Sequence, residues 1–355
     1  MRHIIISDTH SPDCISRIYL TIKEKKIHDL VDAIVINGDL LGVFSMNKSN
    51  MYRVKGLSEE NKDELLKLCA SNFYKEHKDK DLTPDLILEY VKERYEWCYK
   101  ILEMFSELKF TIFNLGNHES EFHMLVLEEL PFLMNVVSDA FENLDYQKLK
   151  QIFYDFEDEL HKLEEGGNFK YIKKEPYVFK DTLILGIPGM SHSTVGNDQM
   201  SQLQESWTAN LVEKAKSMIE GCNKLIIYNH TQANYDRQFG SFGCESPSLN
   251  QFMEEYGGKF DKSIFIQSHN HWSHSQFMKI DDFYFVLNNA GLHSGIFNII
   301  EIDNEVKLLD IDIERNLAED LSLSTSFPEV KSDVDLISRY YSDPESIATR
   351  RTSPK

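Results

Sequence analysis

Short runs of β-branched and aromatic residues recur along the chain, and each run ends at a polar or glycine residue. The clearest runs are Ile4–Ile6, Ile34–Ile36, Ile112–Phe113, Leu225–Ile227 and Ile264–Ile266. Apolar runs of this length, bounded by turn-forming residues, are typical of buried strands. The pattern therefore predicts buried strands distributed over most of the chain.

The first two strands are separated by a segment with helical character. A helix is expected from about Ser16 to Leu30, between the strands Arg2–Ser7 and Ala33–Asn37. A βαβ unit of this kind predicts parallel strands joined by a right-handed crossover. Parallel strands bring their carboxyl ends to one edge of a sheet, where open α/β folds bind their ligands.

Two longer helical segments interrupt the series of strands. The first contains Thr83-Pro84-Asp85, which offers an N-cap, a proline at the first helical position and an acid in the first turn. The second extends from Glu121 to about Glu165 and ends at Gly166-Gly167. We expect one domain over 1–315 with helical insertions at about 45–109 and 121–166, and a polar, partly disordered tail over 316–355.

The strand pattern resumes after the second insertion. A helix is expected near Ala209–Glu220, and Thr231–Pro247 is predicted to be a long loop because it contains several glycines and a proline. A meander of four strands is expected towards the end, at Ser275–Ile280, Phe283–Asn288, Ile296–Ile302 and Val306–Ile311.

Composition and charge narrow the class of protein. The 355 residues, 41% hydrophobic and 27% charged, are typical of a soluble globular chain with a large core. The net charge of −20 opposes binding to nucleic acid through its phosphates, although divalent cations would make an active site locally positive. Because the chain shows no signal segment, no membrane-spanning run and no paired cysteine motif, we expect a cytoplasmic protein without a membrane partner.

Asp, His and Asn side chains follow the predicted strands at five places. These are Asp8-Thr9-His10, Gly38-Asp39, Gly116-Asn117-His118-Glu119, Asn229-His230 and His269-Asn270-His271. If the strands are parallel, the five motifs meet at one edge, and ligands of these types without Cys favour Mn, Fe or Zn. A bridging carboxylate would hold two cations about 3.5–4 Å apart, and the hydroxide between them could attack phosphorus in line. A nearby imidazole could then protonate the leaving group.

These motifs resemble those of the calcineurin-like metallophosphoesterase superfamily: D-x-H, G-D-x-x-D, G-N-H-[DE], a lone His and G-H-x-H. They occur in the family's order from Asp8 to His271, about three quarters of the chain. The resemblance implies a four-layer α/β/β/α sandwich of two mixed β-sheets, with the active site at their shared C-terminal edge. It also implies a phosphoester hydrolase with two divalent metal ions, Mn being the first choice and Fe or Zn the alternatives.

The resemblance further implies a role for each motif residue. Seven residues would be the ligands of two ions that share Asp39. One ion would be held by Asp8, His10, Asp39 and His271, and the other by Asp39, Asn117, His230 and His269. His118 would stand beside the ions as the catalytic histidine.

Two positions depart from the family pattern. Gly42 stands where many members carry a second Asp that orients the catalytic histidine, so His118 needs another partner. Glu119 is one candidate, and an exposed structural role for Glu119 is the alternative. Ser268 replaces a glycine, which should only constrain the local backbone. The arginines with which protein Ser/Thr phosphatases clamp phosphate are absent from the expected places, which disfavours that activity.

The motifs leave the substrate open among monoesters, cyclic or linear diesters, and nucleic acid as a substrate only. A first alternative is a metal-dependent nuclease of the DNA-repair branch, which the acidic charge disfavours. A second is a non-catalytic binding scaffold of the same fold, which the retention of every ligand and of His118 disfavours. His192, His274 and His293 are weaker candidates for substrate contact, and the acidic helices leave room for a homo-oligomer.

Overall fold

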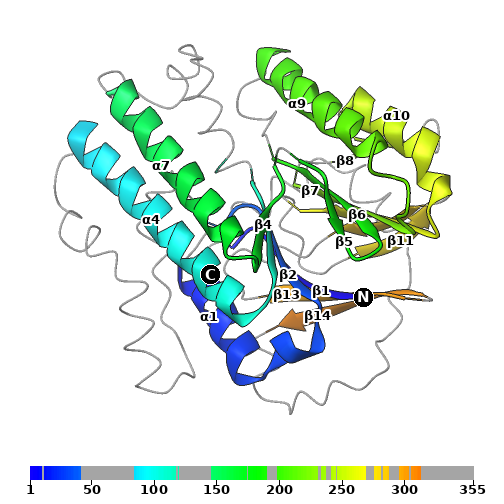
Figure 1. Cartoon of the computed structure of the whole chain (residues 1–355), viewed down its shortest axis with the longest axis horizontal. Coiled ribbons are helices and arrows are strands. Elements are labelled where there is room, and N and C mark those ends of the chain that lie inside the picture. Colours follow the sequence, from blue (N-terminus) through cyan, green and yellow to red (C-terminus); the bar gives the residue numbers. More distant parts are fainter. Residues whose placement is uncertain are drawn as a thin grey trace, which may run out of the picture.

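The computed structural model describes residues 1–9, 12–40, 84–116, 119, 145–173, 175–189, 198–230, 233–236, 241–244, 246–268, 276–280, 283–287, 296–303 and 305–312. Two six-stranded sheets face each other, and helices cover their outer faces (Figure 1). This arrangement confirms the predicted four-layer α/β/β/α sandwich. The remaining parts of the two expected insertions and the tail from residue 316 lie outside the described residues.

The first sheet has the strand order β14-β13-β1-β2-β3-β4. Four parallel strands form one side of it: β1 (Arg2–Ile6), β2 (Ala33–Asn37), β3 (Thr111–Asn114) and β4 (Phe169–Tyr171). Two antiparallel strands complete it: β13 (Ile296–Ile302) beside β1, and β14 (Val306–Asp312) at the edge. Every residue of β2 and β3 is buried, which explains the apolar runs Ile34–Ile36 and Ile112–Phe113 within them, because parallel strands are covered on both faces.

The second sheet has the order β11-β12-β10-β7-β6-β5. Its four inner strands are parallel: β6 (Thr182–Ile187), β7 (Lys224–Asn229), β10 (Lys262–Gln267) and β12 (Phe283–Leu287). The two edge strands are antiparallel to their neighbours: β5 (Tyr177–Phe179) and β11 (Gln276–Ile280). The carboxyl ends of β6, β7 and β10 therefore lie at one edge.

Helices form the two outer layers. The first sheet is covered by α1 (Pro12–Glu24), α4 (Pro84–Leu108) and α7 (Tyr146–Glu165), and the second by α9 (Asp198–Lys216) and α10 (Pro247–Tyr256) (Figure 1). The Asp145 carboxylate caps α7 by accepting the backbone N–H of Gln147 and Lys148. Short 3₁₀ helices, Ile27–Leu30 and Gly257–Lys259, precede β2 and β10.

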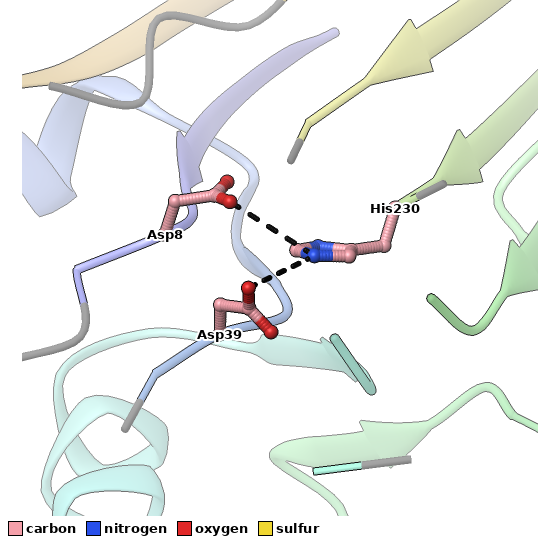
Figure 2. Close-up of side chains that lie close together, drawn as sticks. All are labelled: Asp8, Asp39 and His230. Atoms are coloured by element: carbon pink, nitrogen blue, oxygen red, sulfur yellow. Dashed lines mark ion pairs between the residues drawn. The ribbon is translucent and has the colours of Figure 1, made fainter. Parts of the chain in front are cut away.

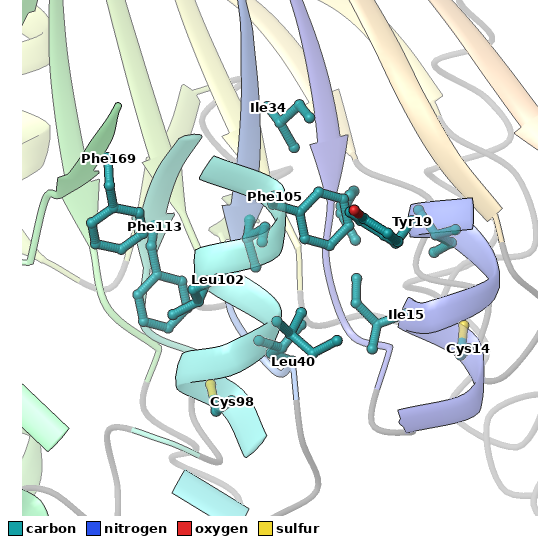
Figure 3. Packing of buried hydrophobic residues seen from close by; sticks show 14 of the residues in the cluster. Cys14, Ile15, Tyr19, Ile34, Leu40, Cys98, Leu102, Phe105, Phe113 and Phe169 are labelled. Carbon is teal, nitrogen blue, oxygen red and sulfur yellow. The ribbon is translucent and has the colours of Figure 1, made fainter. Parts of the chain in front are cut away.

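Three hydrophobic cores hold the layers together. The core between the first sheet and its helices contains Leu102, Phe105 and Phe113, and the rings of Tyr19 and Phe105 meet edge to face with centroids 5.2 Å apart (Figure 3). Such aromatic pairs add about 0.5–1.5 kcal/mol beyond the burial of their area. A second core lies under α9 and α10, and the third fills the space between the two sheets. Helices α4 and α7, although expected as insertions, thus pack directly on the first sheet.

Some helices and strands differ from the sequence prediction. Helix α1 begins at Pro12 and ends at Glu24, so the segment that follows is a 3₁₀ turn rather than the rest of one helix. Helix α9 begins at Asp198, well before the predicted start. The prediction missed its first turns because they are too polar to show an apolar period. The expected loop Thr231–Pro247 contains a hairpin of β8 (Ala233–Asp236) and β9 (Ser241–Cys244).

The last four strands do not form the expected meander. Strands β11 and β12 pair with each other in the second sheet, whereas β13 and β14 pair in the first. The chain therefore crosses from one sheet to the other between β12 and β13. An apolar alternation predicts a half-buried strand, but it does not identify the strand's partner.

Two observations bear on the compartment and on membranes. Cys14, Cys98 and Cys222 carry thiols that take no part in disulfides. Within the described parts of the chain, none of the helices combines the length and the apolar character that crossing a membrane requires.

Candidate metal centre

Three of the predicted metal ligands meet at the carboxyl edge of the sheets. Asp8 follows β1, Asp39 follows β2 and His230 follows β7, so the group joins both sheets (Figure 2). One ligand atom of each residue lies within 4.8 Å of the other two. The Nε2 atom of His230 is 3.2 Å from an oxygen of Asp39 and 3.9 Å from an oxygen of Asp8. All three side chains are buried.

The two aspartates share an uncommon backbone conformation. Asp8 and Asp39 both have φ of 50°, in the left-handed region that non-glycine residues seldom adopt. Aspartate tolerates this region better than most residues, because its short side chain can hydrogen-bond locally. The N–H of Asp8 donates to the carbonyl oxygen of Gly38 at 3.0 Å, which ties the two loops together. Strained backbone of this kind concentrates at binding and active sites.

Gly38 and Gly116 allow three loops to approach one another. A Cβ atom at Gly38 would overlap the backbone of Gly116 and the imidazole of His230. A Cβ atom at Gly116 would overlap the backbone nitrogen and a carboxylate oxygen of Asp39. The glycine in each of the two motifs is therefore required by close packing behind the candidate metal ligands.

His230 is held in the orientation of a metal ligand. Its Nδ1 atom lies 2.8 Å from the carbonyl oxygen of Asn37, which can only accept, so Nδ1 carries the proton and Nε2 faces the aspartates. Metal-binding histidines commonly donate their second N–H to a backbone carbonyl in this way.

The charges around His230 decide its protonation in the absence of a cation. Burial alone would lower the pKa of His230, but the negative charges of Asp39 and Asp8, with hydrogen bonds to Asp39 and Asn37, raise it to about 10. A proton on Nε2 thus occupies the position between the carboxylates that a cation would take. Two carboxylates and one imidazole nitrogen suit Mn, Fe or Zn, so the group could hold a metal ion.

The described residues contain only part of the predicted site. Five of the eight predicted site residues lie outside the described residues: His10, Asn117, His118, His269 and His271. Gly42, His192, His274 and His293 lie outside them as well. The assignment of these residues therefore stays a prediction.

Glu119 is described, and it is only 1% exposed. The expected alternative of an exposed Glu119 is therefore wrong. Its Oε2 atom accepts the backbone N–H of Asp39 and that of Gly116, both at 2.9 Å. Whether Glu119 also orients His118 stays a prediction, because His118 is outside the described residues.

A buried amide cluster lies directly behind the centre, and sequence reasoning missed it. The Asn37 amide donates to the Ser268 hydroxyl at 2.8 Å, and the Asn114 amide donates to Asn37 at 2.9 Å and to the Ile187 carbonyl at 3.0 Å. The bonds to Ser268 and Ile187 join the first sheet to the second. Ser268 therefore does more than constrain the backbone, contrary to expectation. The available signal was an Asn at the end of an apolar strand, where Asn is uncommon.

Comparison with protein-family models and with curated proteins identifies no relative. No protein-family model matches the sequence, and no curated protein matches it significantly. The resemblance to metallophosphoesterases thus rests on the motifs alone.

Proposed function

We propose that this protein is a metal-dependent phosphoester hydrolase, acting as a phosphatase or phosphodiesterase with two divalent ions. The observation that carries the proposal is the buried group of Asp8, Asp39 and His230, whose ligand atoms lie within 4.8 Å of one another. The group stands at the carboxyl edge of two sheets, where open α/β folds bind their ligands. The motif order around it, which resembles that of the metallophosphoesterases, supports the same reaction.

The proposed ligand sets share Asp39. Asp8, His10 and His271 would complete the coordination of one ion, and Asn117, His230 and His269 that of the other. Mn is the first choice of metal, and Fe or Zn are the alternatives. When bound, two such metal ions polarise the phosphoryl oxygens and supply a hydroxide nucleophile at neutral pH.

The protein's own residues would position the reaction. The Asn37 carbonyl holds His230 in one tautomer, and the packing of Gly38 against Gly116 keeps the metal-binding loops in contact. His118 follows the proposed ligand Asn117 directly, so it would reach the leaving group and donate a proton to its oxygen.

The charge of the protein supports a small substrate. At a net charge of −20, the surface repels polyanions, and phosphate-driven affinity for DNA needs many basic contacts. Two cations at one edge would make that edge alone attractive to a phosphoester. A small monoester or diester is therefore favoured over nucleic acid.

A substrate panel tests the proposal. The metal-stripped protein would be reloaded with Mn²⁺ and given p-nitrophenyl phosphate, its bis-ester, cyclic nucleotides, and single- and double-stranded DNA. We expect turnover of a small ester that is lost on chelation and restored by Mn²⁺. Cleavage of DNA alone would favour the nuclease, and a metal-loaded protein inert to every ester would favour the scaffold.

The proposal includes a cytoplasmic location. The thiols of Cys14, Cys98 and Cys222 support it, because cytosolic proteins keep their cysteines reduced. A homo-oligomer stays a prediction, which light scattering on the purified protein would test.

A further inference from the structure

Glu119 is a buried carboxylate that contacts two of the loops at the metal centre. One of these loops follows β2 and carries Asp39, and the other follows β3 and begins with Gly116. A single oxygen of Glu119 accepts a backbone N–H from each loop at 2.9 Å. Hydrogen bonds to an ionised carboxylate are about twice as strong as neutral ones.

This contact fixes the backbone of a metal-binding residue. The bonded amide of Asp39 belongs to the residue whose φ of 50° places it in the left-handed region. The amide of Gly116 belongs to the residue before Asn117, and Gly116 already packs against Asp39 too tightly to accept a Cβ atom. A shift of the Glu119 carboxylate would therefore move both loops at once.

Glu119 is buried beside the candidate centre, with its Oε2 atom against the backbone of Asp39. A buried carboxylate is costly unless hydrogen bonds or opposite charges compensate for its lost hydration. A divalent cation at Asp8, Asp39 and His230 would supply such a charge.

We propose that Glu119 is a positioning residue that sets the affinity of the centre for divalent cations. It clamps the backbone of Asp39 and Gly116 behind the ligands. This inference rests on the proposed function, because it requires the centre to bind a metal. It assigns to Glu119 a part in metal binding that is separate from any contact with His118.

Glu157 provides a matched control. It is another buried carboxylate, 7% exposed, but it pairs with the buried Lys173 at 3.1 Å on the outer side of the first sheet. Loss of its charge would destabilise the interior by leaving Lys173 without its partner, without touching the loops of Asp39 and Gly116. An effect on metal binding that is specific to Glu119 is therefore separable from general destabilisation.

The test measures Mn²⁺ binding to the metal-stripped full chain by titration calorimetry and by the electron paramagnetic resonance signal of free Mn²⁺. Glu119→Gln keeps the length of the side chain but replaces the carboxylate by an amide, which is a weaker acceptor and adds an N–H donor. Glu119→Asp keeps the carboxylate but is too short to reach both amides. We expect affinity to fall about 10–100-fold in each variant, as for other residues that orient metal ligands. Glu157→Gln should bind Mn²⁺ with the affinity of the natural protein. Thermal unfolding of each metal-free variant would verify that it is folded.

The outcomes are distinct. If the natural protein binds no Mn²⁺, the proposed function fails. If it binds Mn²⁺ and the folded Glu119 variants bind equally well, Glu119 has no positioning role. An equal loss of affinity in Glu157→Gln would also overturn the inference, because the effect would then come from general destabilisation. Should one Glu119 variant not fold, the other decides.

Discussion

Acid should destabilise this protein through His3, a histidine enclosed between the two sheets. His3 lies on β1 with no exposed surface, and its Nδ1 atom is 2.6 Å from the hydroxyl of Tyr228 on β7. Burial raises the pKa of Tyr228, so the hydroxyl keeps its proton and can donate it to Nδ1 while His3 is neutral. A proton on Nδ1 would remove this acceptor and place a charge in an apolar core.

The size of the effect follows from the pKa of His3. Burial lowers this pKa from 6.5 to about 3; Asp32 opposes the change, while the N-terminal ammonium and Lys180 add to it. Above about pH 6.5 both the folded and the unfolded chain hold a neutral His3, and its ionisation has no effect on stability. Below that pH only the unfolded chain takes up the proton, so stability falls as pH falls towards 3. At about 1.4 kcal/mol per pKa unit, the loss reaches about 3 kcal/mol at about pH 4.

Denaturant unfolding between about pH 7.5 and pH 4 measures this loss. His3→Gln does not titrate, and its amide can still bond to the Tyr228 hydroxyl. The free energy of unfolding of the variant should therefore depend less on pH than that of the natural protein, by about 3 kcal/mol over the range. His28→Gln, at a half-buried histidine of the 3₁₀ turn before β2, serves as the control. Parallel pH profiles for the natural protein and His3→Gln would refute the argument.

Four further predictions concern the metal centre. Asp39→Asn should reduce the content of both metals, and an unchanged stoichiometry by elemental analysis would contradict a bridging role. His118→Asn should lower turnover by about 10²–10⁴-fold and leave metal content intact, whereas a parallel loss of metal would make His118 a ligand. Because the pKa of His230 is about 10 without metal, Mn²⁺ uptake near neutral pH should release a proton and strengthen as pH rises. Calorimetry in buffers of different ionisation enthalpy measures that release, and its absence would show that His230 is not a ligand. Gly116→Ala should cost about 1–3 kcal/mol and weaken metal binding, because its Cβ would overlap Asp39. Gly166→Ala, at the end of α7, should leave metal binding unchanged, and equal metal affinity in both variants would refute the packing argument.

The accuracy of the sequence prediction differed from one element to another. Strand β2 was predicted with its observed bounds, because all of its residues are buried and all but the terminal Asn37 are apolar. The β8–β9 hairpin was missed, since glycines and polar residues there resemble a loop, and no helix was predicted over α10. The sequence also placed β11 to β14 in one meander, although the chain changes sheet after β12.

The sequence by itself determined which segments are buried strands and which chemical groups follow them. Local apolar runs are sufficient to identify the buried strands, and the Asp, Asn and His residues at the strand ends indicate the chemical groups. Only the tertiary structure decided that His230 meets Asp8 and Asp39, that Glu119 is buried against their loops, and that Asn37, Asn114 and Ser268 join the sheets. The physical reason is the distance along the chain: the hydrogen bond that orients His230 joins residues 193 positions apart. Such contacts depend on how the two sheets pack, and no local pattern of residues contains that information.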